Sequence, residues 1–510
     1  MRTLGVGKGT KAFVARWDPV AASGHHLPMS SVPAQAFWLQ PLLQRTWQVL
    51  AIWTIAATFF FNAERAGLDR GQAAIAASMA MLVVLPALFL FHRSSFGARI
   101  IANVRNAVCA LPTRQFLIGV VVAGVVLRLI IAALYSGPQK ADGETYFSLA
   151  AQLATGSYGG ASIGHAYWPP GLPLFFLPFV LLFGPTLKVI SIANLLLYLG
   201  TTWSTFRLAE LVGGPTLARF SVLFLSFWPN LILLAPTATK ELLLLFLLTT
   251  AVLTFAKGLA GSWGNFLATG ILLGAAALTQ PSLMLMPFVA AFAVLFLHGT
   301  LPKRLGSGLL IVVTAMLVIL PWTIRNYVVL DSFVPVSTGG GDIFYRANNP
   351  IATGGYMDLG AVDLSGLDEL EKSRRGFELG REWVTTHPIE FLRLSIYRQV
   401  LFLGDDGLGA YETIKRSLEI EGLEYALAKA VSNAYWLFML ACILMAGRAL
   451  HRFSPVLLTL LTVPVLYFLA IDTVFEAGSR HHIPLTAILA ILASALFLSS
   501  EERSGRANQT

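Results

Sequence analysis

Twelve stretches of this chain are apolar for about as many residues as a helix needs to cross a lipid bilayer. They lie near residues 46–62, 72–92, 115–135, 187–212, 216–235, 241–257, 263–279, 282–298, 305–322, 431–449, 453–471 and 483–499. Of the 510 residues, 56% are hydrophobic and 12% are charged, against about 25% charged in soluble domains. The sequence therefore predicts an all-α polytopic membrane protein with about twelve transmembrane helices.

Lysine and arginine stand mainly at the ends of these stretches, where cytoplasmic loops collect positive charge. This pattern predicts that both termini are cytoplasmic, with residues 1–44 as a cytoplasmic N-terminal segment. Topology thus accounts for the net charge of +9, and no nucleic-acid partner is expected. The two cysteines, Cys109 and Cys442, are too few for a disulfide framework or a cysteine metal site.

The apolar stretches divide the rest of the chain into four further parts. These are an additional N-terminal helix pair (45–114), a membrane core (115–322) with a first outer loop (136–186), an extracytoplasmic cap (323–430), and C-terminal helices with a short cytoplasmic tail (431–510). Within the outer loop, residues 171–184 are apolar but shorter than the roughly 20 residues that cross a bilayer. We expect an interfacial helix there, because a crossing would place later basic clusters outside.

The predicted cap holds 16 of the chain's 27 acidic residues. Its first half, residues 331–360, is rich in glycine, asparagine and proline and is expected to form loops and turns. Its second half has helical periodicity with mixed charges over residues 367–383, 388–403 and 411–430. We expect a small, mainly helical domain.

Two acids and an aromatic cluster occupy the first outer loop. Asp142, Glu144 and Tyr146 follow the third apolar stretch directly, and His165 and Trp168 come next, in the sequence His-Ala-Tyr-Trp-Pro-Pro-Gly. Acids this close to a helix start can also be there because they complement the helix dipole. Catalysis and helix capping both remain open for this pair.

A second carboxylate is expected at the same depth. Lys240 and Glu241 open the apolar stretch 241–257 on the outer face, after Pro-Thr-Ala-Thr. Because a carboxylate near the membrane is costly, Glu241 should face water or a cation. Lys240 could contact a substrate, although extending its ammonium group to the lipid headgroups is the simpler role.

Three arginines and a histidine complete the candidate residues. Arg480 and His481 precede the last apolar stretch, where a guanidinium and the amides of a helix start could bind a phosphate. A metal shared by His481 and His482 is less favoured, because neighbours on a helix point about 100° apart. Arg325 and Arg346, near the start of the cap, could bind an anionic substrate or form structural ion pairs, and Trp322 fits a membrane-interface anchor.

These residues, in this order, resemble the C-type glycosyltransferases of the protein-mannosyltransferase and aminoarabinose-transferase superfamily. The resemblance covers roughly residues 115–500 and rests on Asp142, Glu144, Tyr146, Trp168–Gly171, Pro236, Thr237, Glu241, Arg325, Asn326, Arg480 and Pro484. Two departures stand out. Gly143 separates acids that are often adjacent in the family, and Gln280-Pro281 replaces an Arg-Pro element.

The resemblance implies a bacterial inner-membrane enzyme with its site on the extracytoplasmic face. Such enzymes move a sugar, hexosyl or pentosyl, from a polyprenyl-phosphate carrier to a lipid, polysaccharide or protein acceptor, usually with inversion. It implies that Asp142 acts as general base or orients the acceptor. No cofactor is assigned, and a divalent metal remains open.

Two functions of other classes compete with this interpretation. A flippase or transporter of lipid-linked saccharides would place polar residues along a pathway through the membrane midplane, whereas the acids here gather at one face. A membrane assembly factor would use the cap to bind a partner and would tolerate alanine at Asp142.

Overall fold

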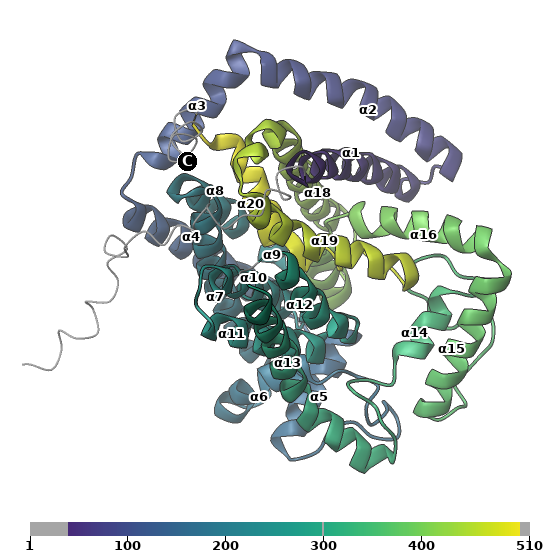
Figure 1. Ribbon diagram of the computed structural model, residues 1–510. Coiled ribbons are helices and arrows are strands. Elements are labelled where there is room, and N and C mark those ends of the chain that lie inside the picture. The colour runs from purple at the N-terminus through teal and green to yellow at the C-terminus, as the bar shows by residue number, and fades with distance from the viewer. Residues whose placement is uncertain (1–38, 298–299, 500–510) are drawn as a thin grey trace, which may run out of the picture.

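The computed structural model describes residues 39–297 and 300–499, and its regular structure is helical apart from one isolated bridge between Gly160 and Gly164 (Figure 1). The α-helices outside the predicted cap are α1 (Leu39–Arg65), α2 (Arg70–Arg93), α3 (Ser95–Cys109), α4 (Thr113–Tyr135), α5 (Asp142–Ala154), α6 (Gly171–Phe183), α7 (Leu187–Gly213), α8 (Pro215–Ser226), α9 (Pro229–Leu233), α10 (Lys240–Leu259), α11 (Gly264–Thr279), α12 (Met286–Leu297), α13 (Leu301–Leu330), α18 (Leu423–Met445), α19 (Pro455–Val474) and α20 (Thr486–Ser494). Most of the predicted N-terminal segment 1–44 and the tail from residue 500 lie outside the described residues. The all-helical membrane fold is confirmed.

All twelve predicted apolar stretches are helical, but they differ in length. Within the described residues, eight helices are long and apolar enough to cross a membrane: α1, α2, α4, α7, α10, α13, α18 and α19. The other four stretches are shorter helices or helix pairs, α8 with α9, α11, the 3₁₀ turn Pro281–Leu285 with α12, and α20 with its flanking 3₁₀ turns. The number of crossings remains a prediction.

Helix α6 is the short apolar segment of the first outer loop. It has 13 residues and ends at Gly184, whose φ of 72° favours glycine. At 1.5 Å per residue it spans about 20 Å, less than the roughly 30 Å hydrocarbon core. Its length agrees with the expected interfacial helix.

Helix α3 is an element that the sequence analysis did not predict. It begins after Ser94, whose hydroxyl accepts a hydrogen bond from the Gly97 amide at 2.9 Å. One side carries exposed apolar residues, Phe96, Ile100 and Val104, at helical spacing. At 15 residues with two arginines, the segment is too short and too polar to register as a membrane span.

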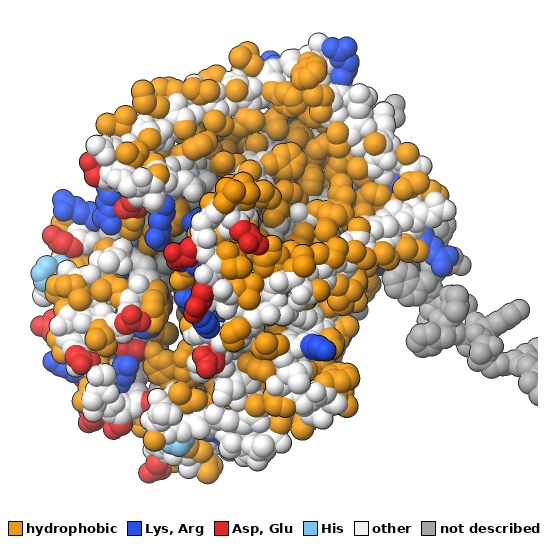
Figure 2. Space-filling model, turned by 180° about the vertical axis from the view of Figure 1, so that it is seen from behind, with side chains coloured by type: hydrophobic (Ala, Val, Ile, Leu, Met, Phe, Trp, Pro, Cys, Tyr) orange, Lys and Arg blue, Asp and Glu red, His pale blue; other side chains and the backbone are white. Residues whose placement is uncertain are grey.

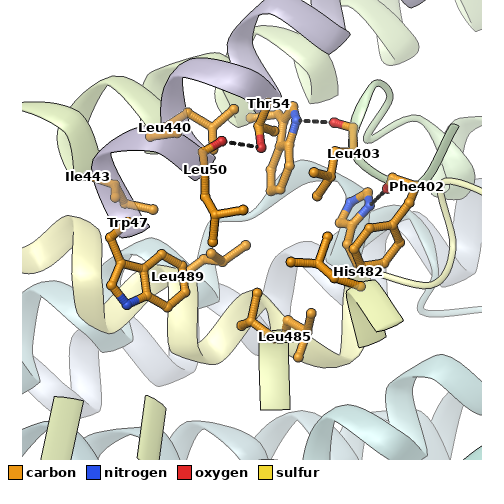
Figure 3. A pocket seen from close by; sticks show the side chains of 14 residues that line it. Trp47, Leu50, Thr54, Phe402, Leu403, Leu440, Ile443, His482, Leu485 and Leu489 are labelled. Atoms are coloured by element: carbon orange, nitrogen blue, oxygen red, sulfur yellow. Dashed lines mark hydrogen bonds between the residues drawn. The ribbon is translucent and has the colours of Figure 1, made fainter. Parts of the chain in front are cut away.

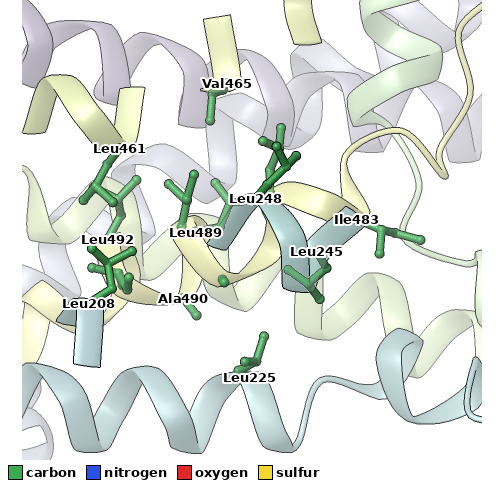
Figure 4. Close-up of a cluster of buried hydrophobic side chains, with 14 of the residues drawn as sticks. Leu208, Leu225, Leu245, Leu248, Leu461, Val465, Ile483, Leu489, Ala490 and Leu492 are labelled. Carbon is green, nitrogen blue, oxygen red and sulfur yellow. The ribbon is translucent and has the colours of Figure 1, made fainter. Parts of the chain in front are cut away.

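The centre of the bundle is α20, all nine residues of which are buried. Its sequence, Thr-Ala-Ile-Leu-Ala-Ile-Leu-Ala-Ser, is almost entirely apolar, as expected for a helix surrounded by others. Leucines of α7, α8, α10 and α19 converge on it (Figure 4). Just beyond it, the rings of Phe497 and Phe220 of α8 stack at 4.2 Å.

The predicted cap begins later than expected. Helix α13 continues through Pro321 to Leu330, eight residues past the predicted boundary at 322, so Arg325 and Asn326 lie on its last turns and not in a loop. A proline inside a membrane helix is tolerated where neighbouring groups satisfy the freed carbonyl. Beyond it stand α14 (Gly340–Ala347), α15 (Glu369–Thr386), α16 (Pro388–Leu403) and α17 (Leu408–Ala410).

Helices α15 and α16 match the periodicity of the second half of the cap within three residues, but two local expectations are wrong. Helix α14 lies in the segment expected to hold only loops and turns. Residues 411–430 are not one helix, because a π-helical turn, Tyr411–Ser417, ends before Glu419 (φ 57°) and Gly422 (φ 100°), and α18 begins after them.

Charged side chains gather at the edge of the molecule that holds α14 and α15 (Figure 2).

The topology can be tested with single cysteines in a Cys109→Ser, Cys442→Ala background. Ser157, Ser262 and Ser365 are all exposed, so labelling at each depends on the side of the membrane. Ser157→Cys and Ser365→Cys should react with a membrane-impermeant maleimide from outside, and Ser262→Cys only after the membrane is broken. Labelling of Ser262→Cys, but not of Ser365→Cys, from outside would mean that α6 crosses or that a helix is miscounted.

Candidate active site

Four segments that are distant in sequence meet at one cleft with about 510 Å³ of empty volume. They are the loop before α5, the loop before α10, the π-helical turn of the cap, and the loop after α19. The cleft is lined by Pro138, Gln139, Lys140, Asp142, Gly143, Tyr146, Thr237, Ala238, Thr239, Lys240, Glu241, Leu408, Glu412, Arg416, Ser417 and Arg480. The structure thus brings together five of the predicted residues: Asp142, Tyr146, Lys240, Glu241 and Arg480.

The first two of these loops are tied together by Gln139. Its side-chain nitrogen donates to the Pro236 carbonyl at 3.0 Å, and its side-chain oxygen accepts from the Ala238 amide at 2.7 Å. Gly143 lies beside these hydrogen bonds, and a Cβ at this position would approach the Ala238 carbonyl oxygen to 3.2 Å. The glycine that separates the two acids therefore permits a close approach of the loops.

Arg480 stands between the two carboxylates. Its Nη1 donates to Asp142 Oδ2 at 2.6 Å, and its Nε lies 3.9 Å from Glu241 Oε1. The side chains of Arg480 and Asp142 are 28% and 37% exposed, whereas that of Glu241 is 5% exposed. The Asp142 side chain is thus paired with Arg480. Asp142 and Glu144 also both stand in the first turn of α5, where their charges complement the helix dipole, so the two interpretations of this pair are not exclusive.

The charges in the cleft fix the protonation of Asp142. Burial raises the pKa of its carboxyl, but the positive charges of Arg480 and Lys240 outweigh this and hold the pKa below its usual value. Burial likewise lowers the pKa of the Arg480 guanidinium, which Asp142 and Glu241 raise above its ordinary range. Both groups are therefore charged at neutral pH.

Glu241 and Lys240 occupy the first turn of α10. One carboxylate oxygen of Glu241 accepts from the Thr239 hydroxyl, and the other has no hydrogen-bond donor within the described part of the chain. Lys240 lines the cleft, with no carboxylate within 4 Å among the described residues. The cleft therefore contains a cation whose charge is not taken up by direct ion pairing.

The cap contributes an outer wall that the sequence analysis missed. On the π-helical turn, Glu412 accepts from Arg416 at 2.7 Å, and burial raises the pKa of Glu412. The turn is fixed by two hydrogen bonds, Thr413 to the Leu233 carbonyl and Ser417 to the Pro138 carbonyl, at 2.6 and 2.9 Å. No local pattern marks these residues, because only the pairing of the cap with the outer loops brings them to the cleft.

The aromatic residues of the outer loop support the cleft from behind. Tyr146 is buried and lines the cleft, and Trp168 packs edge-on against it, with ring centroids 5.2 Å apart. Tyr158 donates to the Trp168 carbonyl at 2.9 Å. Trp168 is therefore placed to hold Tyr146, whereas Glu144 is exposed on α5 and does not line the cleft.

Arg325 and His165 form a separate contact. Arg325 donates to the backbone carbonyls of His165 and Tyr158 at 2.6 and 2.8 Å, and it stacks on the Trp322 ring at 4.9 Å. Neither residue lines the cleft. Trp322 is itself buried and donates to the Val336 carbonyl at 2.9 Å, so its ring organises the protein interior.

Arg346 and His481 are paired with buried acids. Arg346 lies 3.8 Å from Asp342 and 3.7 Å from Glu476, which matches the ion-pair alternative for this arginine. His481 Nδ1 lies 2.7 Å from Asp472 Oδ1.

His482 has different partners, so the two adjacent histidines share no ligand position. Among the described residues, no group of three or more His, Cys, Asp and Glu side chains is placed to hold a metal ion.

Residues 168–324 match the sequence model of the family described as dolichyl-phosphate-mannose-protein mannosyltransferase. The matched segment includes Trp168, Lys240 and Glu241, and it excludes Asp142 and Arg480. The match confirms the resemblance to C-type membrane glycosyltransferases predicted from the sequence. The curated proteins contain no match to this chain.

Two solved structures are similar in fold at low identity. The oligosaccharyltransferase of Archaeoglobus fulgidus in the apo form gives a TM-score of 0.45 at 11% identity over 74% of this chain and 50% of that one. The structure of ArnT from Cupriavidus metallidurans bound to undecaprenyl phosphate gives 0.37 at 16% identity over 77% and 78%. The chain spans about half the length of the archaeal protein.

Arg325→Ala should loosen the loop that carries His165 without closing or opening the cleft. Two backbone carbonyls lose a charged donor, and a hydrogen bond to a charged group contributes about 1.5–3 kcal/mol. Hydrogen exchange of residues 158–166 should rise at least about tenfold. Arg381→Ala, an exposed arginine on α15, is the matched control, and unchanged exchange in Arg325→Ala would remove this role.

Proposed function

We propose that this chain is an integral-membrane glycosyltransferase that moves a sugar from a polyprenyl-phosphate-linked donor to an extracytoplasmic acceptor, with inversion. The observation that carries the proposal is the convergence of Asp142, Glu241, Arg480 and Lys240 on one cleft, where α5 and α10 begin. The acceptor class is a lipid, a polysaccharide or a protein, and the sugar a hexose or a pentose. The proposed location is the bacterial inner membrane, with the cleft on the periplasmic face.

The reaction requires a base for the acceptor and positive charge for the leaving phosphate. The acceptor hydroxyl or amine attacks the anomeric carbon and gives its proton to Asp142, while the bond from that carbon to the phosphate oxygen breaks. Help from a positioned base is worth about 10²- to 10⁴-fold. The low pKa of Asp142 keeps this base ionised at neutral pH.

The departing phosphate has two cations available. Lys240 has no carboxylate within 4 Å among the described residues, and Arg480 offers a guanidinium held from behind by Glu241. Positive groups fixed where charge develops lower the barrier without having to reorganise. The donor's lipid chain accounts for a cleft at the membrane edge, because the phosphate of a membrane-anchored carrier lies at that depth.

A transporter is less consistent with the surroundings of Arg128, a buried charged side chain in the second half of α4. Arg128 of α4 donates to the carbonyls of Gly124 and Ser226 at 3.1 and 3.0 Å and lies over the Tyr198 ring at 3.8 Å. Intramembrane charges that mark a pathway face water-filled cavities or one another. Arg128 borders a cavity with Asn194 and Thr201, but its Nη1 is bound to two backbone carbonyls, one of them at the end of α8, and that is a packing role.

Asp142→Asn should reduce transfer by at least about 10²-fold, because the change is nearly isosteric and removes the base. Turnover of a polyprenyl-phosphate sugar by the purified protein is the measurement, with thermal unfolding to confirm the fold. Glu144→Gln is the matched control, since Glu144 lies two residues away on the same helix and is exposed. Activity close to wild type in Asp142→Asn would remove Asp142 from the catalytic role.

Arg480→Ala and Lys240→Met should each weaken binding of the donor phosphate more than binding of the acceptor. Binding of undecaprenyl phosphate to the purified protein measures the first effect, and the acceptor KM measures the second. Arg480→Lys should rescue only in part, because lysine lacks the bidentate fork. Unchanged donor binding in all three variants would leave Arg480 and Lys240 as structural cations.

The acid limb of the pH–rate profile reports on the Asp142–Arg480 contact. A base acts only when deprotonated, so activity is present above its pKa and is lost as the pH falls through it. Because Arg480 lowers the pKa of Asp142, Arg480→Gln should raise this pKa and move the acid limb to higher pH. Arg480→Lys keeps the charge and should move the limb less; an identical limb in both variants would contradict the coupling.

A further inference from the structure

A buried hydrogen-bonded cluster lies behind the cleft and has no part in the reaction described above. Its centre is Asp406, which is 0% exposed and follows α16. One carboxylate oxygen accepts from the Trp228 indole at 2.6 Å, and the other accepts from the Asn230 amide and lies 3.0 Å from His482 Nε2. The cluster joins the α8–α9 turn, the end of α16 and the loop after α19.

Trp228 and Asn230 each donate to a different oxygen of Asp406, so both of these oxygens must be able to accept a hydrogen bond. The indole of Trp228 can only donate. The Asn230 side-chain oxygen accepts from the Gly409 amide at 2.6 Å, which fixes its nitrogen toward Asp406. An asparagine at position 406 would turn an NH₂ group toward one of these two donors in either orientation. The site is therefore specific for a carboxyl group.

His482 is held from both ring nitrogens. Nδ1 lies 2.8 Å from the Phe402 carbonyl, which can only accept, so Nδ1 carries a proton. The contact between Nε2 and Asp406 then needs one further proton, on either the ring or the carboxyl. The pair thus holds a shared proton, and the imidazole also stacks on Trp436, with centroids 4.6 Å apart.

His482 also lines a second cavity. This cavity is lined by Trp47, Leu50 and Thr54 of α1 together with Phe402 and residues of α18–α20 (Figure 3). Neither Asp406 nor His482 lines the cleft that holds Arg480. The pair therefore cannot touch a substrate in that cleft and can act on it only through a neighbouring residue.

That neighbour is Arg480, two residues before His482 in the loop 475–482. Besides the contacts of Arg480 itself, the rest of the loop has several ties to other segments. The Ala477 amide donates to the Gly354 carbonyl at 3.0 Å, His481 contacts Asp472, Glu476 lies 3.7 Å from Arg346, and the Phe475 ring packs against Phe344. The His482 contacts anchor its end to the α16–α17 linker, whose next residues lead into the π-helical wall of the cleft. The contacts of His482 thus connect the loop that carries Arg480 to the segment that leads into the facing wall of the cleft.

We propose that Asp406 and His482 are positioning residues, which fix the loop 475–482 so that Arg480 sits between Asp142 and Glu241. The placement of Arg480 follows from the geometry alone, and its effect on phosphate binding rests on the proposed function. A positioning role differs from a general stabilising role in one respect. When it is lost, the loop that carries Arg480 should become more mobile even though the protein remains folded.

The test uses the full-length purified protein with Asp406→Asn and His482→Gln. Thermal unfolding and size-exclusion chromatography establish that each variant is folded. Hydrogen exchange of residues 475–482 reports on the loop, and the Kd for undecaprenyl phosphate reports on Arg480. Asp405→Asn is the matched control, because Asp405 is adjacent and contacts Lys429 and Asn433, not His482.

We expect at least about tenfold faster exchange in the loop and about tenfold weaker binding of undecaprenyl phosphate in Asp406→Asn, with the control unchanged. His482→Gln should show smaller effects, because a glutamine amide can still donate to Asp406. His482→Leu removes that donor and should match Asp406→Asn.

Folded Asp406→Asn protein with wild-type exchange and binding would overturn the proposal, as would equal effects in Asp405→Asn. If Asp406→Asn does not fold, the comparison of His482→Gln with His482→Leu decides by the same two measurements. If the wild-type protein does not bind undecaprenyl phosphate, the proposed donor is wrong, and the exchange measurement alone decides on the positioning role.

Discussion

A single guanidinium, that of Arg480, is shared by two carboxylates, and the other contacts of the cleft depend on that arrangement. Arg480 connects the start of α5 to the start of α10, and without it two acids would converge where burial makes their charge costly. Gln139 fixes the same two loops through the backbone. The cleft is therefore held by the ionic contacts of Arg480 and by the two neutral hydrogen bonds of Gln139.

Much of this arrangement was predictable, because it follows from where the apolar segments end. Asp142, Glu241 and Arg480 each stand near an end of such a segment, and the charge pattern that predicts the orientation of the helices also predicts one face for all three. The structure places them in contact. Their roles in a reaction remain proposals.

What could not be predicted depends on pairings between distant segments. Glu412 and Arg416 reach the cleft only because Thr413 and Ser417 bond to loops some 180 and 280 residues away in sequence. Arg325 was a candidate for substrate binding, and only the positions of the His165 and Tyr158 carbonyls show that its donors are used. The extension of α13 through Pro321 was missed because proline usually marks a helix end in water.

The buried position of α20 bears on how this protein can be assembled. A helix enters the bilayer as it is synthesised, and α20 follows nearly all the helices that surround it. Those helices, α7, α8 and α10 among them, must wait in the membrane with their inward faces open to lipid or to one another until α20 arrives. Final packing of these helices thus waits until α20 has been synthesised, and the loop that carries Arg480, which directly precedes α20, joins the other parts of the cleft no earlier than that.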